Sequence, residues 1–351
     1  MKKLLRAAAF LLIAAYIFNI ADRVLVRKSL HGSWNITAKT NGFFNLAEDS
    51  CDVVFFGSSH AYCSFNPLII YDEARLGSYV AATQKQPVWA SYYYIKEAIA
   101  RQKPAAVVLD CFSVTLDGDY SDEATRYTYT DDFPDGINKL ALVGCSAEDF
   151  KSRFDLLFRF TKYHSRWSEL TADDFGYNPK KLSDPLCGYC LLTSTDKTLT
   201  RESYRNVRGE IPLSEKNEDY LKRIITLCRK SGTRLLLAVN PSNETARERM
   251  IYNSVRTLAE KNDTEFINFN DLYDEIGLDI SSDFYDRAHL NYRGAIKFSR
   301  YFAENMLADI PRKGKFDENL MQRRLARFYR EAEGDTNPFS GILHKPAALD
   351  F

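Results

Sequence analysis

Residues 52–60 read DVVFFGSSH. The apolar residues before Gly57 have the length and the β-branched or aromatic character of a buried β-strand, which the glycine ends. Comparable apolar runs follow at residues 78–82, 105–109, 234–239 and 265–268. Between and after them, helical patterns occupy residues 67–76, 88–101, 214–231, 244–261 and 292–307. Because strands alternate with helices, the expected fold is an α/β protein, a three-layer α/β/α sandwich with a short parallel sheet.

The domain boundaries follow changes in composition. The α/β domain is expected over residues 45–310, interrupted at about 112–212 by a segment rich in Asp, Tyr, Thr and Ser. This segment is too long for a structureless loop, so we expect an insertion with its own helices, the strongest over 147–170, and a hairpin. Residues 311–351 are expected to form a charged helix, at 317–333, and a tail.

The N-terminus has the pattern of a membrane anchor. Three of the first six residues are basic, and a mostly apolar run over residues 7–20 follows. This order predicts a signal anchor or transmembrane helix over residues 1–28, with its N-terminus in the cytoplasm and the rest of the chain outside it. Bulky Phe18 and Ile20 lie beside Ala21 and make a poor cleavage site; cleavage would give a secreted protein. A buried helix of a soluble protein is the alternative.

The composition excludes several classes of protein. Lys and Arg total 47, as do Asp and Glu, whereas nucleic-acid-binding proteins usually carry a basic excess, so no nucleic-acid partner is expected. A hydrophobic fraction of 45% excludes a disordered chain. The seven cysteines include one C-x-x-C pair, Cys187 and Cys190, without the further ligands that a zinc site needs. We expect no metal and no cofactor, and we interpret the pair as a strained turn whose oxidation to a disulfide stays open.

Two short segments carry the candidate chemistry. Gly57-Ser58-Ser59 follows the first strand, and Asp286-Arg287-Ala288-His289 stands just before the helix at 292–307. A hydroxyl after a strand lies at the carboxyl edge of a parallel sheet, where α/β proteins bind ligands. Asp and His three positions apart in a turn approach each other, so the carboxylate orients the imidazole as a base for serine. In the alternative interpretation, both serines are turn residues and His289 caps a helix.

These segments resemble the SGNH (GDSL-type) hydrolase superfamily, whose first block is strand-G-D-S and whose last block is D-x-x-H before the C-terminal helix. Ser58 stands where the family has Asp, and the resemblance covers residues 52–307 without the insertion. The anchor and the G-S-S block are most similar to a membrane-anchored branch of DltD-like and alginate-acetylation-type proteins. The resemblance implies a flavodoxin-like fold, with Ser59 as nucleophile, His289 as general base and acid, and Asp286 orienting the imidazole. Ser58, one position earlier, is the alternative nucleophile.

The oxyanion hole departs from the family pattern. The family uses the nucleophile's own N–H, a Gly after the second strand and an Asn after the third, but residues 82–87 lack Gly and residues 110–113 lack Asn. Losing one donor typically lowers the rate by about 10²–10³. As substitute donors or substrate contacts we expect Gln84, Gln86, Ser113, His60 and Asn240. For His60 and Asn240, a capping role is the alternative.

The resemblance implies a serine esterase or O-acyltransferase that acts outside the cytoplasm on acyl esters of a cell-envelope polysaccharide or wall polymer. Its expected partners are this acylated carbohydrate, the membrane and a membrane-bound O-acyltransferase. The alternative is a non-catalytic binding or assembly factor of the same fold, which assists a membrane O-acyltransferase. The set of Ser59, His289 and Asp286 favours the enzyme, whereas the altered oxyanion blocks favour the assembly factor.

Overall fold

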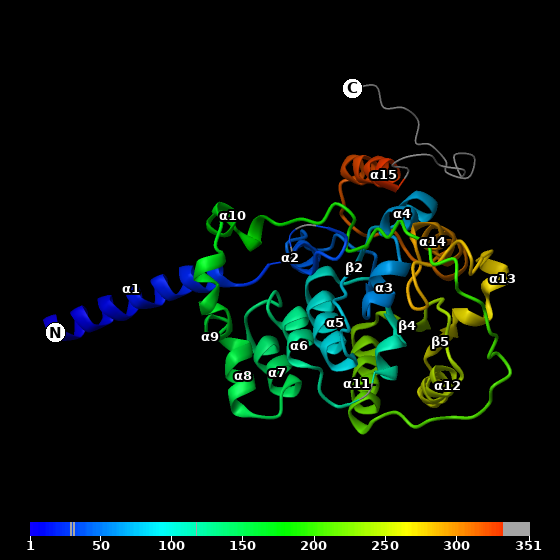
Figure 1. The fold of residues 1–351 in the computed structure, drawn as a ribbon, viewed down its shortest axis with the longest axis horizontal. Helices are drawn as coiled ribbons and strands as arrows, with labels where there is room; N and C mark the ends of the chain where they lie inside the picture. The colour runs from blue at the N-terminus through cyan, green and yellow to red at the C-terminus, as the bar shows by residue number, and fades with distance from the viewer. Residues whose placement is uncertain (29, 31, 117, 333–351) are drawn as a thin grey trace.

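A five-stranded parallel sheet forms the centre of the protein in the computed structural model, which describes residues 1–28, 30, 32–116 and 118–332 (Figure 1). The strands are β1 (Val53–Phe56), β2 (Ser78–Val80), β3 (Ala106–Asp110), β4 (Arg234–Val239) and β5 (Glu265–Asn268). Their order is β2-β1-β3-β4-β5, and every neighbouring pair is parallel. Flavodoxin-like folds have this order and bind ligands at the carboxyl ends of β1 and β3, where the order reverses. The five predicted strands are confirmed.

Helices cover both faces of the sheet, which confirms the three-layer architecture. One face carries α4 (Pro67–Ala74) and α14 (Tyr292–Met306), with α15 (Glu318–Ala332) packed on α4. The other face carries α5 (Val88–Gln102), α11 (Glu215–Ser231) and α12 (Ala246–Lys261) (Figure 1). The predicted helices at 88–101, 214–231, 244–261 and 292–307 coincide with these elements to within about two residues.

The centre of the core lies around β1. All four residues of this strand are fully buried, as expected for a central strand with helices on both faces. Phe55 of β1 stacks on Phe65 at a ring-centroid distance of 4.3 Å. Phe298 and Phe302 of α14 pack on Phe65 at centroid distances of 5.3 and 5.0 Å. This aromatic cluster ties the last helix to the first strand, so the two sequence segments with candidate chemistry are held close together.

Residues 118–181 contain several short helices, residues 182–214 contain neither helix nor strand, and the expected hairpin is wrong. The segment contains α6 (Glu123–Thr130), α7 (Ile137–Ser146), α8 (Phe150–Leu157), α9 (Phe160–Tyr163) and α10 (Ala172–Gly176). No strand occurs between β3 and β4 within the part of this segment that the structure describes. The single helix expected over 147–170 is broken at Phe158, whose ψ of 73° leaves the helical region. The segment lacks the alternation of apolar and polar residues that a half-buried hairpin needs.

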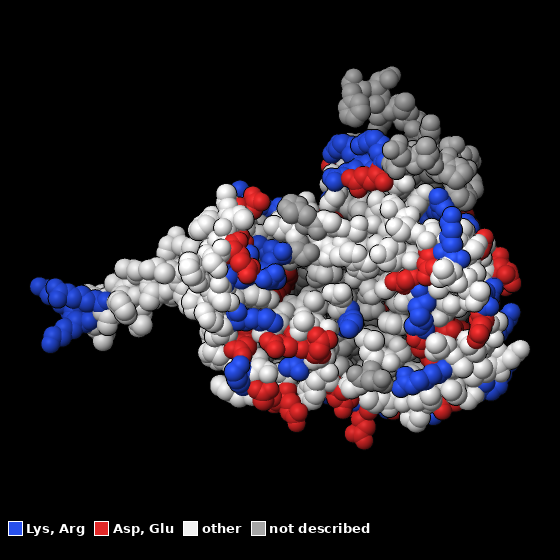
Figure 2. Space-filling view, viewed as in Figure 1, with Lys and Arg blue, Asp and Glu red and all other residues white. Residues whose placement is uncertain are grey.

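The N-terminal helix α1 (Lys2–Leu25) is long and apolar enough to cross a membrane. It projects from the rest of the protein, and Figure 2 shows basic side chains at its free tip and an uncharged shaft behind them (Figures 1 and 2). Its other end is fixed to the domain, because Asp22 accepts hydrogen bonds from the guanidinium of Arg159 at 2.5 and 3.1 Å. A second helix, α2 (Ile36–Phe44), follows; it is buried along its whole length and was not expected.

Candidate active site

Ser59 lies at the carboxyl end of β1, as the first residue of α3 (Ser59–Ser64). The turn before it requires glycine, because Gly57 has φ of +142° and a Cβ there would lie 2.9 Å from the Cβ of Asp110. Ser58 is fully buried, and its hydroxyl caps α3 by accepting from the N–H of His60 at 3.4 Å. The two serines therefore differ in placement: Ser58 is committed to the helix cap, and Ser59 points to the opposite loop.

That opposite loop carries Asp286 and His289. An antiparallel bridge joins Phe284 to Leu290, and the N–H of Tyr285 donates to the carbonyl of His289 at 2.9 Å. Inside the loop, the carboxylate of Asp286 accepts the backbone N–H groups of Ala288 at 2.8 Å and His289 at 2.9 Å. The Asp side chain therefore holds its own turn closed, and this fixes the distance between the carboxylate and the imidazole.

The three side chains form one continuous chain of hydrogen bonds. His289 Nδ1 lies 2.9 Å from both carboxylate oxygens of Asp286, and His289 Nε2 lies 2.7 Å from Ser59 Oγ. Although burial raises the pKa of Asp286, the hydrogen bond and charge of His289 outweigh it and hold the pKa below its usual value. A carboxylate at this position favours the tautomer with the proton on Nδ1, so Nε2 is free to accept the proton of Ser59.

His60 and Asn240 lie next to this group without joining it. The ring of His60 stacks on Phe112 at a centroid distance of 3.6 Å and meets the ring of His289 at 5.6 Å. Burial lowers the pKa of His60 well below its usual value, so this imidazole is neutral. The side-chain amide of Asn240 donates to the carbonyl of His60 at 3.4 Å, and its backbone N–H donates to Asp110 at 3.2 Å. Both residues therefore support the turn behind Ser59.

In the part of the chain that the structure describes, the side chains of the three residues expected as oxyanion donors are not hydrogen-bonded to the Ser59 group. Gln86 is buried and its amide donates to the hydroxyl of Ser91 at 3.0 Å. Gln84 is exposed, and Ser113 lines a separate cavity. Within the described residues, no hydrogen bond joins any of these three side chains to the group formed by Ser59, Asp286 and His289. The N–H of Ser59, the first of α3, has no acceptor inside the helix and is a donor next to the Ser59 hydroxyl.

Two aromatic residues beside the site were not expected. The indole of Trp34 meets the rings of His289 and Tyr62 edge-on, at centroid distances of 5.8 and 5.9 Å. The hydroxyl of Tyr62, on the same helix as Ser59, is buried beside Ser59 without a hydrogen bond of good geometry. The helical spacing of Ser59 and Tyr62 is a signal that the sequence contains. Trp34 follows the anchor, far from either motif, so nothing local indicates its position.

A groove of about 590 Å³ leads from Trp34 toward the end of the anchor. Its lining is mostly polar and aromatic and includes Arg27, Lys28, Trp34, Thr37, Gln84 and Tyr127. No group of three or more His, Cys, Asp or Glu side chains suited to a metal ion occurs in the described ranges. All seven cysteines are free thiols in the structure, and the turn at Cys187 and Gly188 has positive φ at both residues.

Comparison with known proteins gives the following matches. A protein-family model matches residues 197–311, which make up less than half of the chain. No curated protein matches the chain. The solved structure of a protein from Desulfitobacterium hafniense, which is assigned to the lipolytic G-D-S-L family, matches with a TM-score of 0.36 at 9% identity. The match covers 72% of this chain and 97% of that one. An acetylxylan esterase from Geobacillus stearothermophilus, solved as a catalytic mutant, has a TM-score of 0.35 at 11% identity, over 78% and 97%. A protein from Parabacteroides merdae, which is assigned as a GDSL-like lipase, has a TM-score of 0.33 at 11% identity. The match covers 74% of this chain and 96% of that one.

Proposed function

We propose that this protein is an SGNH-type serine esterase or O-acyltransferase, with Ser59 as nucleophile, His289 as general base and acid, and Asp286 as the residue that orients the imidazole. The observation that carries the proposal is the chain of hydrogen bonds from Asp286 through His289 to Ser59, at 2.9 and 2.7 Å. Ser59 and His289 lie 230 positions apart in the sequence, and Ser59 begins α3 at the carboxyl end of β1. A serine hydroxyl hydrogen-bonded to an imidazole that is oriented by a carboxylate is the arrangement that activates serine toward acyl groups.

In the proposed reaction, Ser59 Oγ attacks the carbonyl carbon of an ester while His289 Nε2 takes the hydroxyl proton. The resulting imidazolium is stabilised by the carboxylate of Asp286, and the N–H of Ser59 donates to the developing oxyanion. When the C–O bond to the alcohol breaks, His289 returns the proton to the leaving oxygen and an acyl-enzyme remains. Water or a second hydroxyl then attacks the acyl carbon, with His289 again taking and returning one proton. Water gives hydrolysis, and another hydroxyl gives acyl transfer.

The proposed substrate is an acylated carbohydrate of the cell envelope, handled outside the cytoplasm. Three features support this: the apolar helix α1, the groove that runs from its end to Trp34, and the polar and aromatic lining of that groove. The lining also carries Asp131, Asp132 and Lys162, whose polar groups can hydrogen-bond the hydroxyls of a carbohydrate but would lose their hydration under a lipid tail. The similarity of the two motifs to the membrane-anchored SGNH branch supports the same assignment.

A second candidate function is a non-catalytic assembly factor that supports a membrane O-acyltransferase. One observation favours it: the amide of Gln86 donates to Ser91 and Ser113 lines another cavity, so within the described residues neither side chain is hydrogen-bonded to the Ser59 group. Each missing donor corresponds to about 10²–10³ in rate. Ester hydrolysis by the protein that is faster than the uncatalysed reaction would therefore support the enzyme over the assembly factor.

The test is ester hydrolysis by the full-length chain in detergent, with p-nitrophenyl acetate as the substrate. Ser59→Ala is expected to lower kcat/KM by about 10⁴-fold or more, because the nucleophile is lost. Ser64→Ala is the matched control, because it removes another buried serine hydroxyl of α3, one that has no hydrogen-bond partner among the described residues. Its kcat/KM is expected to equal that of the wild type. Equal rates for the wild type and Ser59→Ala would contradict the proposed enzymatic function and favour the assembly factor.

A further inference from the structure

The part of the insertion at the base of α1 carries exposed aromatic side chains. Figure 1 shows α8, α9 and α10 in a row along the edge of the domain from which α1 projects, and a short helix, η2 (His164–Glu169), joins α9 to the segment before α10. Within residues 150–175 the side chains of Phe150, Trp167 and Phe175 have exposed fractions of 81%, 74% and 64%. We call the exposed set the aromatic edge; its members are Phe150, Phe154, Phe158, Trp167 and Phe175.

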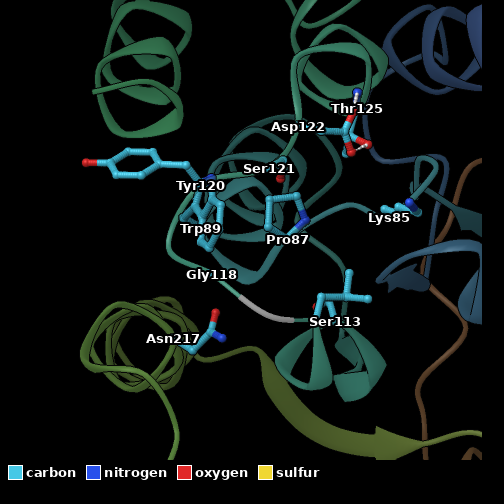
Figure 3. Close-up of a pocket in the computed structure, with 11 residues that line it drawn as sticks. Lys85, Pro87, Trp89, Ser113, Gly118, Tyr120, Ser121, Asp122, Thr125 and Asn217 are labelled. Atoms are coloured by element: carbon cyan, nitrogen blue, oxygen red, sulfur yellow. Dashed lines mark hydrogen bonds between the residues drawn. The ribbon is translucent and has the colours of Figure 1, made fainter. Parts of the chain in front are cut away.

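The aromatic edge is a patch and not a scatter of single residues. Along α8, the ring of Phe154 lies 6.2 Å from that of Phe150 and stacks on that of Phe158 at 4.4 Å, both measured between centroids. Tyr120, another exposed aromatic residue, differs: the ammonium of Lys216 lies 4.0 Å from its ring centre, and Figure 3 shows the ring turned away from the cavity at the carboxyl edge of the sheet. Contiguous exposed apolar surface in a soluble domain marks an interaction site.

The insertion is fixed to the end of α1. Leu25 and Val26 pack into one apolar cluster with Leu156 of α8 and Tyr163 of α9. The guanidinium of Arg166, on η2, donates to the carbonyl groups of both Leu25 and Val26 at 2.7 Å, and so pairs carbonyls that the helix end leaves open. The position of the aromatic edge therefore follows from the position of α1.

The apolar part of α1 is short for a bilayer. It covers residues 7–21, between Arg6 and Asp22, and measures about 22 Å at 1.5 Å per residue, whereas the hydrocarbon core is about 30 Å thick. A short span thins the bilayer around it and draws its flanking groups into the interface. Phe18, near the domain end of this stretch, packs on Phe160 of α9 at a centroid distance of 5.2 Å. If α1 spans the membrane, α9 and its neighbours therefore lie at the level of the lipid headgroups.

We propose that the aromatic edge inserts into the lipid–water interface and holds the α/β domain against the membrane. Aromatic side chains are favoured at this level, where an apolar face enters the boundary between headgroups and acyl chains. Figure 2 shows uncharged surface continuing from the shaft of α1 onto the adjoining edge of the domain. Residues 150–175 contain five basic and four acidic side chains, so the attachment is apolar and does not need anionic lipid. The proposal rests on α1 crossing the membrane and not on the esterase reaction.

This attachment decides how a substrate reaches the site. The groove of about 590 Å³ is lined at one end by Arg27 and Lys28, after α1, and by Lys162 and Tyr163 of α9, and it leads to Trp34. With the aromatic edge in the interface, that end of the groove faces the lipid headgroups. A carbohydrate attached to the membrane then enters the groove without leaving the bilayer surface. This consequence rests on the proposed function, whereas the attachment does not.

The test measures the lipid exposure of Trp167 by fluorescence quenching in the full-length protein, reconstituted in phosphatidylcholine vesicles. Phosphatidylcholine brominated close to the headgroup is the shallow quencher, and phosphatidylcholine brominated close to the end of the acyl chain is the deep one. Of the other two tryptophans, Trp89 is 3% exposed and Trp34 is 38% exposed. We expect the shallow quencher to lower the emission more than the deep one. This quenching is expected to be lost in Trp167→Phe and retained in Trp34→Phe.

A double variant locates the attachment. Phe150→Asp combined with Phe175→Asp replaces two largely exposed rings, and each change is expected to lower the ratio of attached to detached domains by about 10-fold. The Tm is expected to stay unchanged, because an acidic residue is favourable at the first position of α8 and Phe175 is exposed. Leu320→Asp is the matched control, since it changes an exposed apolar residue of α15, which lies far from α1 in Figure 1.

Three results would overturn the proposal. The first is undiminished quenching in the double variant. The second is a wild-type protein that resists carbonate extraction but whose Trp167 is not quenched; the anchor would then hold, and the aromatic edge would face solvent, another protein or a second copy of the chain. The third is release of the wild type by carbonate, which would remove the anchor and the attachment together. Ester hydrolysis is measured separately, so a failure of the proposed function is distinguishable from each of these results.

Discussion

Asp286→Asn tests how the carboxylate controls the imidazole. The oxygen Oδ1 of Asp286 accepts the backbone N–H groups of Ala288 and His289 at 2.8 and 2.9 Å, so the amide oxygen of the new Asn is expected to take that place. The amide NH₂ then replaces Oδ2, which lies 2.9 Å from His289 Nδ1. As a donor, it stabilises the imidazole tautomer that carries its proton on Nε2, in competition with the amide oxygen, which also lies 2.9 Å from Nδ1 but already accepts two backbone N–H groups. In that tautomer Nε2 cannot accept the proton of Ser59.

The expected loss is large in activity and small in stability. A wrong tautomer in an otherwise intact triad lowers kcat by about 10⁴, which is the magnitude expected for hydrolysis of p-nitrophenyl acetate by Asp286→Asn. The Tm is expected to change little, because the two backbone hydrogen bonds of the turn remain. Asp274→Asn is the matched control, since that carboxylate is 94% exposed and lies outside the site. An Asp286→Asn protein with more than about a tenth of the wild-type kcat would refute the proposed role of the carboxylate.

Three further predictions concern the fold. Gly57→Ala places a Cβ 2.9 Å from the Cβ of Asp110 at a φ of +142°, and is expected to destabilise the protein by about 3 kcal/mol in urea unfolding; an unchanged midpoint would show that the turn is not strained. Burial raises the pKa of Asp110 from 3.8 to about 7, so the folded state retains a proton that the unfolded state has lost, and stability falls by roughly 3–4 kcal/mol as pH rises from about 4 to 7. Asp110→Asn is expected to remove this pH dependence of stability. Identical pH profiles of unfolding for the wild type and Asp110→Asn would contradict the assignment to Asp110. Leu12→Arg puts a charge in the middle of α1 and costs about 3 kcal/mol of membrane insertion, seen as release by carbonate extraction; full retention would argue against a membrane-spanning α1.

The sheet was predictable because its signals are local. Each strand is a short apolar run that ends at a polar or glycine residue, and each long helix between strands repeats its apolar positions at helical spacing. Ser214 and Gly232 mark the ends of α11 in the sequence, and the structure has a side-chain cap at one and a left-handed residue at the other. Order along the chain then implies parallel strands, since the crossover helices leave no other arrangement.

The candidate site was predictable only where a motif is continuous in sequence. Asp286 and His289 interact within one turn, so their geometry follows from their spacing. The choice between Ser58 and Ser59 depends on which serine caps α3, which is a matter of three-dimensional turn geometry. Trp34 reaches His289 from outside the sheet, and Gln86 turns toward Ser91 instead of the site. Such long-range packing leaves no pattern in a single sequence.

The most direct test of the central claim is to label the full-length protein with a fluorophosphonate and map the modified residue by peptide mass spectrometry. A fluorophosphonate reacts with an activated serine and forms a stable phosphonyl ester. We expect one adduct, on Ser59, that is lost in Ser59→Ala and formed at least about 10³-fold more slowly in His289→Ala, because the base is missing. No adduct, or an adduct on Ser58, would contradict the assignment of Ser59 as the nucleophile.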